Sequence, residues 1–357
     1  MTAVRVAVEV SADGTVRARL FGRHAYSARD TVGPLSGPDW DLTGLFRRWL
    51  SQRARVWQPD EVRAFGVLLH RRLFAGPNVW PWIEKQTDGA ALVRLTLSFP
   101  AEPPYSQLAA LPWEYLYVPG EPTRKGEFLA EREGFSLARY IPLRAGVPQL
   151  SPVERPRLLA VVSSPETLGE VVAEPVLAAL RDAAGLAGFE HREVRLTSAD
   201  EMRDAIAGWQ PHLVHFLGHG EFDQATGAGL LAFPAAGGRA AWVGDAAVAK
   251  LFVSREHAPR VVVLHACEGG VTDYDAQFAG VASTLTRAGA QCVVAMQYPV
   301  TNRAAIAFST AFYRELAAHG TVDLAAQQAR RELAGPELGD PRLVGIPVIY
   351  LHNDTSL

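Results

Sequence analysis

The sequence has 357 residues, of which 48% are hydrophobic and 20% are charged, a balance typical of globular proteins that excludes a disordered or fibrous chain. This length can hold two ordinary domains or one large domain. The formal net charge of −3 at pH 7 gives no overall basic excess of the kind that binds nucleic acid. Two cysteines are too few for a disulfide framework and suit a reducing compartment.

No stretch of the sequence approaches the ~18 consecutive apolar residues that a membrane-spanning helix needs. The first residues alternate valine with other side chains, a pattern that favours a strand over a signal peptide. We therefore expect a cytoplasmic protein with no membrane partner.

The first part of the chain mixes strand-like and helix-like patterns. Residues 4–10 and 15–21 are typical of a hairpin joined by Ala12-Asp13-Gly14. Apolar residues at helical spacing predict helices over 40–54 and 60–75. Strand patterns follow at 91–99, 127–130 and 136–142.

A proline-bearing stretch at 144–157 with little apolar content predicts a domain boundary, which divides the chain into domains 1–150 and 151–357. Beyond it, apolar runs of strand length occur at 158–163, 212–217, 260–266, 292–297 and 346–351. Helical patterns lie between most of these runs, at 171–185, 199–208, 244–252, 277–288, 302–318 and 321–334. This alternation predicts an α/β fold with a mostly parallel sheet covered on both faces.

Two of the predicted strands end in residues with catalytic chemistry. The strand HLVHFL is followed by Gly218-His219-Gly220, and the strand RVVVLHA by Cys267. Functional residues gather at the carboxyl ends of parallel strands, so we expect His219 and Cys267 at one edge of the sheet. An imidazole beside a thiol stabilises the reactive thiolate and later protonates a leaving amine. The backbone N–H groups of Gly220 and Cys267 could hold an oxyanion.

Other chemistry has less support in the sequence. Cys292 opens an apolar strand, so we interpret it as a buried structural residue. A disulfide with Cys267 is not expected, because the two residues would lie at opposite ends of their strands, ~15 Å or more apart. We find no Walker loop, no H-E-x-x-H, no G-x-S-x-G and no metal-ligand spacing, so no cofactor or metal is expected.

Several ordered motifs resemble one family. The stretches VHFLGHGEFD (214–223), VVVLHACEGG (261–270) and the run at 280–316 are similar to CHAT domains, which are caspase-like cysteine peptidases related to separase and caspases. LPWEYLYVPG (111–120) and FSLARYIPL (135–143) resemble the region that precedes the catalytic part of such domains. The resemblance covers roughly residues 90–357.

The resemblance implies a caspase-like three-layer sandwich with a mostly parallel central sheet over 151–357. It also implies a smaller, degenerate protease-like lobe over 1–150. His219 would be the catalytic histidine and Cys267 the nucleophile. Trp113 and Glu114 match a family motif, and we interpret them as packing and hydrogen-bonding residues.

One departure concerns the substrate pocket. In related peptidases the residue two positions before the nucleophile lines the pocket for the P1 side chain, and here that residue is His265 rather than an acid. A period-two strand points His265 and Cys267 to one face. Arg or Lys at P1 is therefore not expected to be required. Further pocket candidates are Gln297, Tyr298, Asp223, Asp273 and Asp275.

The leading hypothesis is therefore a cysteine endopeptidase that cleaves a protein substrate encoded nearby, with an activating partner protein or self-processing as the trigger. Relatives of this kind act in bacterial conflict and defence systems. Two alternatives stay open: a catalytically silent scaffold of the same fold that binds a partner protein, and a small-molecule sensor at the same sheet edge. The intact Cys–His pair argues against the first, and the missing phosphate loop against the second.

Overall fold

The computed structural model describes residues 3–21, 26–50, 52, 55–120, 122, 124–142, 153–223, 228–254, 256–266, 277–298 and 300–352. Contacts divide the chain into two compact units. The N-terminal unit comprises Met1–Tyr140 and Ala334–Gly345, and the C-terminal unit comprises Ile141–Leu333 and Ile346–Leu357. That domains 1–150 and 151–357 are a degenerate protease-like lobe and a catalytic lobe stays a prediction.

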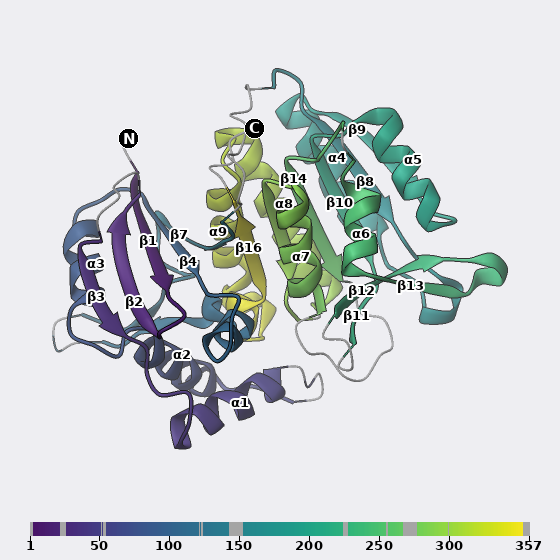
Figure 1. Ribbon diagram of the computed structural model, residues 1–357. Helices are drawn as coiled ribbons and strands as arrows, with labels where there is room; N and C mark the ends of the chain where they lie inside the picture. Colours follow the sequence, from purple (N-terminus) through teal and green to yellow (C-terminus); the bar gives the residue numbers. More distant parts are fainter. Residues whose placement is uncertain are drawn as a thin grey trace. The chain divides into compact units, whose positions relative to one another are not determined.

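The described residues of the N-terminal unit form a sheet and the α-helices α1, α2 and α3 (Figure 1). The strands run in the order β3-β2-β1-β4-β7 and have the bounds β1 Val4–Val10, β2 Thr15–Leu20, β3 Ala28–Thr31, β4 Val93–Ser98 and β7 Phe135–Tyr140. The helices are α1 Pro38–Leu50, α2 Pro59–Leu73 and α3 Val79–Thr87. A separate two-stranded ribbon pairs β5 Tyr117–Val118 with β6 Glu127–Phe128.

The predicted hairpin is confirmed as the antiparallel pair β1–β2. Its turn has a local cause: the Asp13 carboxylate accepts a hydrogen bond from the Thr15 amide at 2.9 Å, and Gly14 adopts a positive φ of 78°. The predicted helices at 40–54 and 60–75 correspond to α1 and α2, and the predicted strand at 91–99 to β4.

Helix α3 was not predicted, because its sequence VWPWIEKQT is short and has no capping residue that the structure uses. The backbone amides at its start donate their hydrogen bonds to a residue outside the helix. The Asp30 carboxylate of β3 accepts from the amides of Asn78 at 2.9 Å and Val79 at 2.6 Å. A contact over 48 residues thus supplies the N-terminal cap, and α3 packs on β1, β2 and β3.

The segment Ala334–Gly345 belongs to the N-terminal unit although it lies late in the chain. The Tyr115 hydroxyl donates to the carbonyl of Arg342 at 2.8 Å. A side chain at Gly345 would place a Cβ 2.5 Å from the Tyr115 ring, so this close approach requires glycine. Nothing in the local sequence pattern of this segment predicted that membership.

In the described part of the C-terminal unit, six strands are neighbours in a sheet, in the order β16-β15-β14-β10-β8-β9. The strands are β8 Arg157–Val162, β9 Glu190–Arg195, β10 Leu213–Gly218, β14 Val261–Ala266, β15 Cys292–Met296 and β16 Pro347–Leu351. Neighbours run parallel except for the antiparallel pair β15–β16. All five predicted strands are confirmed, whereas the polar edge strand β9 (EHREVR) was not predicted, because little of it is buried.

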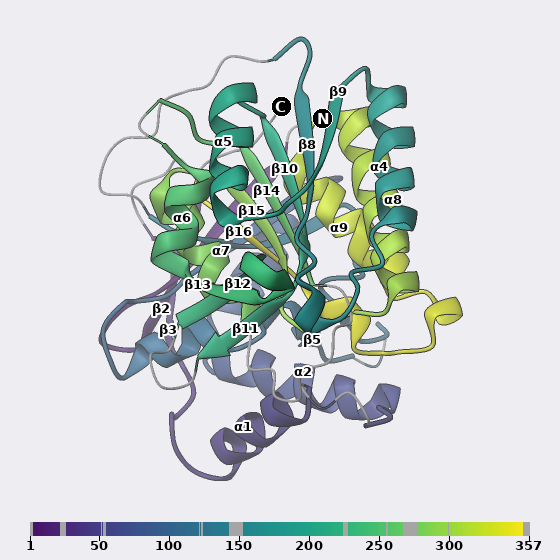
Figure 2. The same cartoon turned by 90° about the vertical axis from the view of Figure 1, so that its right-hand side faces the viewer.

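Helices cover both faces of this sheet (Figure 2). One face packs against α5 Ala199–Trp209, α6 Asp245–Phe252 and α7 Gln277–Ala288. The other lies against α4 Glu174–Ala187, α8 Asn302–His319 and α9 Val322–Leu333. Alternate strand residues fill the core on the first face, among them Val161, Val214, Phe216, Val262 and Leu264. The predicted fold class, a three-layer sandwich with a mostly parallel sheet, is confirmed.

A small antiparallel sheet follows β10 and was not predicted. It consists of β11 Gly220–Asp223, β12 Ala228–Pro234 and β13 Ala240–Gly244. Leu231 and Phe233 of β12 are buried in the same core as α6 and α7. Within the described ranges, none of the helices combines the length and apolar character that crossing a membrane requires.

Candidate active site

Strands β10 and β14 are parallel neighbours in the sheet, with Leu213 opposite Val261 and Gly218 opposite Ala266. Gly218 and Ala266 directly precede His219 and Cys267 in the sequence. The carboxyl ends of the two strands therefore meet at one edge, as the sequence predicted. Cys267 itself lies outside the described residues, as do Asp273 and Asp275.

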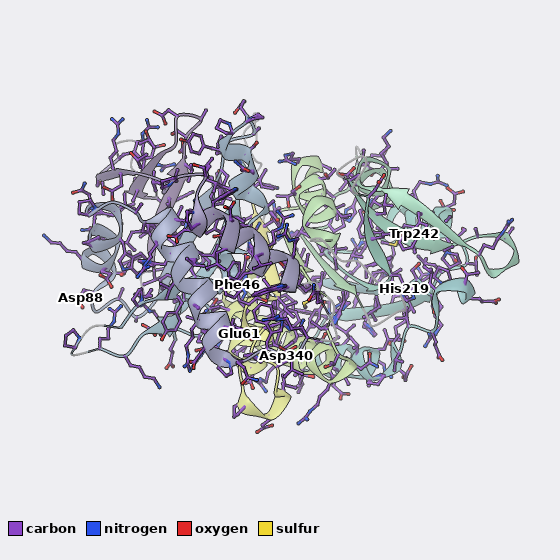
Figure 3. All side chains as sticks on the ribbon, turned by 90° about the horizontal axis from the view of Figure 1, so that it is seen from below. Phe46, Glu61, Asp88, His219, Trp242 and Asp340 are labelled. Carbon is purple, nitrogen blue, oxygen red and sulfur yellow. The ribbon has the colours of Figure 1, made fainter. Side chains whose placement is uncertain are left out.

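His219 connects β10 to β11 and is 4% exposed (Figure 3). Its Nε2 lies 3.2 Å from the carbonyl oxygen of Gly169. A carbonyl can only accept a hydrogen bond, so Nε2 carries the hydrogen and donates. In the neutral ring Nδ1 is then left as the acceptor, which is the atom able to take up a proton.

Burial lowers the pKa of His219 below its ordinary value of 6.5, and the hydrogen bond to Gly169 partly opposes that shift. The imidazole is consequently neutral at pH 7. A neutral ring with one nitrogen held by a carbonyl and the other available is the form that a general base requires.

Gly169 was missed by sequence reasoning. It follows the short 3-10 turn Glu166–Leu168 in the loop after β8 and has φ 86° and ψ 162°, a region that is essentially restricted to glycine. A lone glycine in a polar loop gives no sign of a contact 50 residues along the chain.

The backbone around His219 is fixed by neighbouring segments. The Ala232 amide of β12 donates to the His219 carbonyl at 3.0 Å, and the Ser163 hydroxyl donates to the Ala232 carbonyl at 2.7 Å. A Cβ at Gly218 would lie 2.7 Å from the Phe216 ring, so glycine is needed there for packing. Gly220, the predicted oxyanion donor, is buried and begins β11 opposite Leu231.

The predicted pocket residues lie on several elements. His265 is the next-to-last residue of β14 and is fully buried. Gln297 and Tyr298 follow the end of β15 and are also buried, and the Gln297 amide donates to Ile346 at 2.9 Å. Asp223 is the last residue of β11 and is partly exposed. Their roles in substrate binding stay predictions.

A layer of buried polar side chains lies between the sheet and α8. His215 Nδ1 is 2.9 Å from the Tyr313 hydroxyl, and the rings of His215 and His265 have centroids 5.6 Å apart. Within the described part of the chain, neither ring nitrogen of His265 has a hydrogen-bond partner, and the Ser309 hydroxyl has none either. Burial lowers the pKa of His265 to about 4, so this ring is neutral at pH 7.

Cys292 is the first residue of β15, fully buried and not in a disulfide. Burial, and then the charge of Asp323, raises the pKa of its thiol well above the ordinary value. The thiol is therefore protonated at neutral pH and unsuited to nucleophilic attack. Among the described residues, no three His, Cys, Asp or Glu side chains cluster in a way that could hold a metal ion.

The C-terminal unit is an α/β sandwich with a mostly parallel sheet. A buried histidine that donates a hydrogen bond to a backbone carbonyl follows the carboxyl end of one of its strands. The family model of the CHAT domain matches residues 63–343. This chain therefore belongs to the CHAT domain family.

The Saccharomyces cerevisiae separase–securin complex contains a chain that resembles this one at 15% identity and a TM-score of 0.41, over 80% of this chain and 18% of that chain. This protein thus spans less than a fifth of that chain's length. Among curated protein sequences, none matches.

Proposed function

We propose that this protein is a cysteine endopeptidase in which Cys267 is the nucleophile and His219 the general base. The observation that carries the proposal is the register of β10 and β14, whose last partners are Gly218 and Ala266. His219 and Cys267, which come next in the sequence, therefore follow strand ends that are adjacent in the sheet. The neutral His219 ring, with Nδ1 unoccupied by the Gly169 contact, supplies the base.

The proposed reaction begins when His219 Nδ1 takes the proton from the Cys267 thiol. The thiolate attacks the carbonyl carbon of the scissile peptide bond, and the backbone N–H groups of Gly220 and Cys267 stabilise the oxyanion. The C–N bond breaks while His219 returns the proton to the leaving amine. Water then hydrolyses the acyl-enzyme and restores the thiol.

The two cysteines provide a matched test of this assignment. Cys267→Ala is expected to abolish peptide cleavage and covalent labelling by a thiol-directed peptide probe, while circular dichroism stays as in the parent. Cys292 is buried at the start of β15, at the opposite end of the strand from the candidate site, so Cys292→Ser should keep both cleavage and labelling. Equal loss in the two variants contradicts the assignment, and an unlabelled parent favours a catalytically silent scaffold.

We infer that the P1 side chain of the substrate is neutral. His265 precedes Cys267 by two positions on a strand whose residues alternate in direction, and burial keeps its imidazole uncharged at pH 7. A neutral imidazole does not attract a cationic side chain as a carboxylate would. In a peptide series that varies P1, the parent should accept neutral residues, and His265→Asp should gain cleavage after Arg or Lys. Cleavage by the parent only after Arg or Lys contradicts the inference and favours Asp223, Asp273 or Asp275 as the pocket acid.

Membership of the CHAT domain family is the basis for a proposal about the biological setting. We propose a bacterial conflict or signalling system in which a protein encoded nearby is the substrate and a partner protein, or self-processing, switches the peptidase on. Incubating the purified chain with the products of adjacent genes, singly and in pairs, tests this. Cleavage of one product that disappears with Cys267→Ala is the expected outcome, whereas no cleavage in any combination contradicts it.

A further inference from the structure

The small sheet β11-β12-β13 has two faces with different surroundings. Leu231 and Phe233 of β12 are buried in the core with α6 and α7, and Val243 of β13 packs against the same core. Successive strand residues point to opposite faces, so Leu230 and Trp242 lie on the other face. Both side chains are partly exposed, and among the described residues neither is part of that core. The second face therefore carries apolar side chains that α6 and α7 do not cover.

His219 lies on this second face as well. Its carbonyl accepts a hydrogen bond from the Ala232 amide at 3.0 Å, so the two residues stand opposite each other where β11 begins. Ala232 is in turn opposite Trp242 of β13, and opposite residues share a face (Figure 3). The main sheet gives the same direction, because Phe216 of β10 points into the core with α6 and α7 and His219 comes three positions later. His219, Ala232 and Trp242 thus form one row across the small sheet.

Trp242 and Leu230 together form an apolar patch beside this row. The two residues are diagonal neighbours across the β12–β13 pair, a spacing that an aromatic side chain can span. The residue opposite Leu230 is Gly244, which has no side chain, and a Cβ there would lie 3.8 Å from Leu230 Cδ2. Neighbouring strands are about 4.8 Å apart, so the backbones of His219 and Trp242 are separated by roughly 10 Å. A peptide held at His219 can therefore reach the apolar patch.

The two ends of the apolar patch differ in character. At one end the 3-10 turn Glu166–Leu168 reaches β13, where the Ala240 amide donates to Thr167 Oγ1 at 3.1 Å. At the other end Glu221 of β11 stands opposite Leu230, on the same face, and is partly exposed. A ligand of the patch thus meets a carboxylate at this rim, which disfavours an acidic side chain on the ligand.

The occupant of the apolar patch follows from the direction of the proposed reaction. His219 returns a proton to the leaving amine, so the first residue of the leaving segment must lie beside its ring. An extended peptide advances about 3.3 Å per residue, so the first two residues of that segment cover roughly 7 Å of the distance toward Trp242. Their side chains are the part of a substrate that is placed to contact the patch.

We propose that the apolar patch of Leu230 and Trp242 binds a large apolar side chain at P1′ or P2′, the first two residues after the scissile bond. This inference rests on the proposed peptidase function and adds a preference on the primed side of the substrate. Trp242 is a substrate-binding residue in this scheme, and burial of an apolar side chain against it supplies the affinity. Glu221 disfavours an acidic side chain at the same positions.

Fluorine NMR of the full chain tests the patch without any cleavage. The sequence has eight tryptophans, and in a chain labelled with 5-fluorotryptophan the variants Trp242→Phe and Trp209→Phe identify the resonances of these two residues. The tripeptide amide Leu-Phe-Ala, whose free amine mimics that of a released segment, should shift the Trp242 resonance saturably. Trialanine amide should bind at least about fivefold more weakly, because it buries less apolar surface. The resonance of Trp209, which packs against the core from α5, should not move.

Cleavage kinetics measure the same preference separately. Among peptides that share one unprimed sequence, the parent should cleave those with Leu-Phe at P1′ and P2′ at least about fivefold more efficiently than those with Ala-Ala, and those with Glu-Glu least. Trp242→Ala should lose this preference through a higher KM for the Leu-Phe peptide and keep its rate on Ala-Ala, whereas Trp242→Phe should retain most of it.

The two measurements separate failure of this proposal from failure of the peptidase assignment. An unmoved Trp242 resonance, or an equal response to both tripeptides, overturns the proposal even if the parent cleaves peptides. An unchanged preference in Trp242→Ala overturns it as well. A saturable shift of the Trp242 resonance in a chain that cleaves no peptide supports the patch as a peptide-binding surface and contradicts the peptidase assignment.

Discussion

His219 depends for its orientation on one carbonyl group from the loop after β8. The backbone conformation of Gly169 is available essentially only to glycine, so any side chain there strains the loop by about 1–3 kcal/mol. The hydrogen bond from His219 Nε2 fixes the ring and the tautomer at once. Gly169 is accordingly a positioning residue for the proposed reaction and does not touch the substrate.

We expect Gly169→Ala to lower kcat/KM for a peptide substrate and to shift the acid limb of its pH profile downward. The parent's acid limb should lie below pH 6.5, because burial lowers the pKa of His219. The Gly169 hydrogen bond raises that pKa, so losing it moves the limb to still lower pH. Gly188→Ala, another position of positive φ at the end of α4, is the control and should leave the profile unchanged. An unshifted limb in Gly169→Ala would show that the carbonyl does not act on His219.

Cys292 provides a second prediction at the scale of single residues. Its thiol is fully buried, and its raised pKa keeps it protonated at neutral pH. A small thiol reagent should therefore modify one cysteine of the native chain and two after denaturation, as counted by intact mass. In native Cys267→Ala no modification is expected. Rapid modification of native Cys292 would contradict its structural role.

At the scale of elements, a buried ion pair between Glu114 and Arg139 connects the short 3-10 turn Trp113–Tyr115 to β7. Arg139 and Glu114 are 5% and 0% exposed, and the remaining Arg139 donors reach the carbonyls of Ala109 and Leu111 at 2.7 and 3.0 Å. Trp113 donates from Nε1 to the Leu108 carbonyl at 2.8 Å and stacks on Phe99. The interpretation of Trp113 and Glu114 as packing and hydrogen-bonding residues agrees with these contacts.

Glu114→Ala is expected to destabilise the protein by about 3–5 kcal/mol, because it leaves a buried guanidinium without its carboxylate. Chemical denaturation gives the free energy of unfolding. The control is Glu127→Ala, whose partner Arg132 is more exposed, and it should cost no more than about 1 kcal/mol. If both variants lose the same stability, the Arg139–Glu114 pair does not hold this turn in place.

At the scale of the whole molecule, buried neutral histidines make stability depend on pH. Burial lowers the pKa values of His70 and His265 to about 4, against 6.5 in the unfolded chain. The unfolded state therefore binds more protons than the folded state between these values. The contribution of these histidines to the free energy of unfolding is fully present above pH 6.5. It falls as the pH drops toward 4, by roughly 1.4 kcal/mol per pH unit for each such histidine.

His70→Phe should flatten this dependence. Its ring packs against Phe74 and Trp80, with centroids 5.2 and 4.9 Å away, so phenylalanine suits the site. We expect a smaller difference between the thermal midpoints at pH 7 and pH 5 than in the parent. Trp80→Phe, which alters the same cluster without removing a titratable group, should lower both midpoints and keep their difference. A pH dependence in His70→Phe equal to that of the parent contradicts the assignment.

Much of the fold follows from local patterns in the sequence. Hydrophobic periodicity predicted the β1–β2 hairpin, the strands β8, β10, β14, β15 and β16 of the C-terminal unit and the helices α4 to α9, because each buries a regularly spaced set of apolar residues. It also placed His219 at the carboxyl edge of the sheet, since the residues after apolar parallel strands gather there. Elements without such a pattern were missed, among them β3, β5, β9, α3 and the small sheet β11-β12-β13.

The sequence by itself determined which residue types carry the chemistry and at which strand ends they stand. Only the tertiary structure decided what surrounds them: the Gly169 carbonyl on His219, the β12 amide that fixes its backbone, and the membership of Ala334–Gly345 in the N-terminal unit. These features are contacts between segments far apart in the chain, and periodicity, which reports only local burial, carries no information about which distant segment a given group will meet.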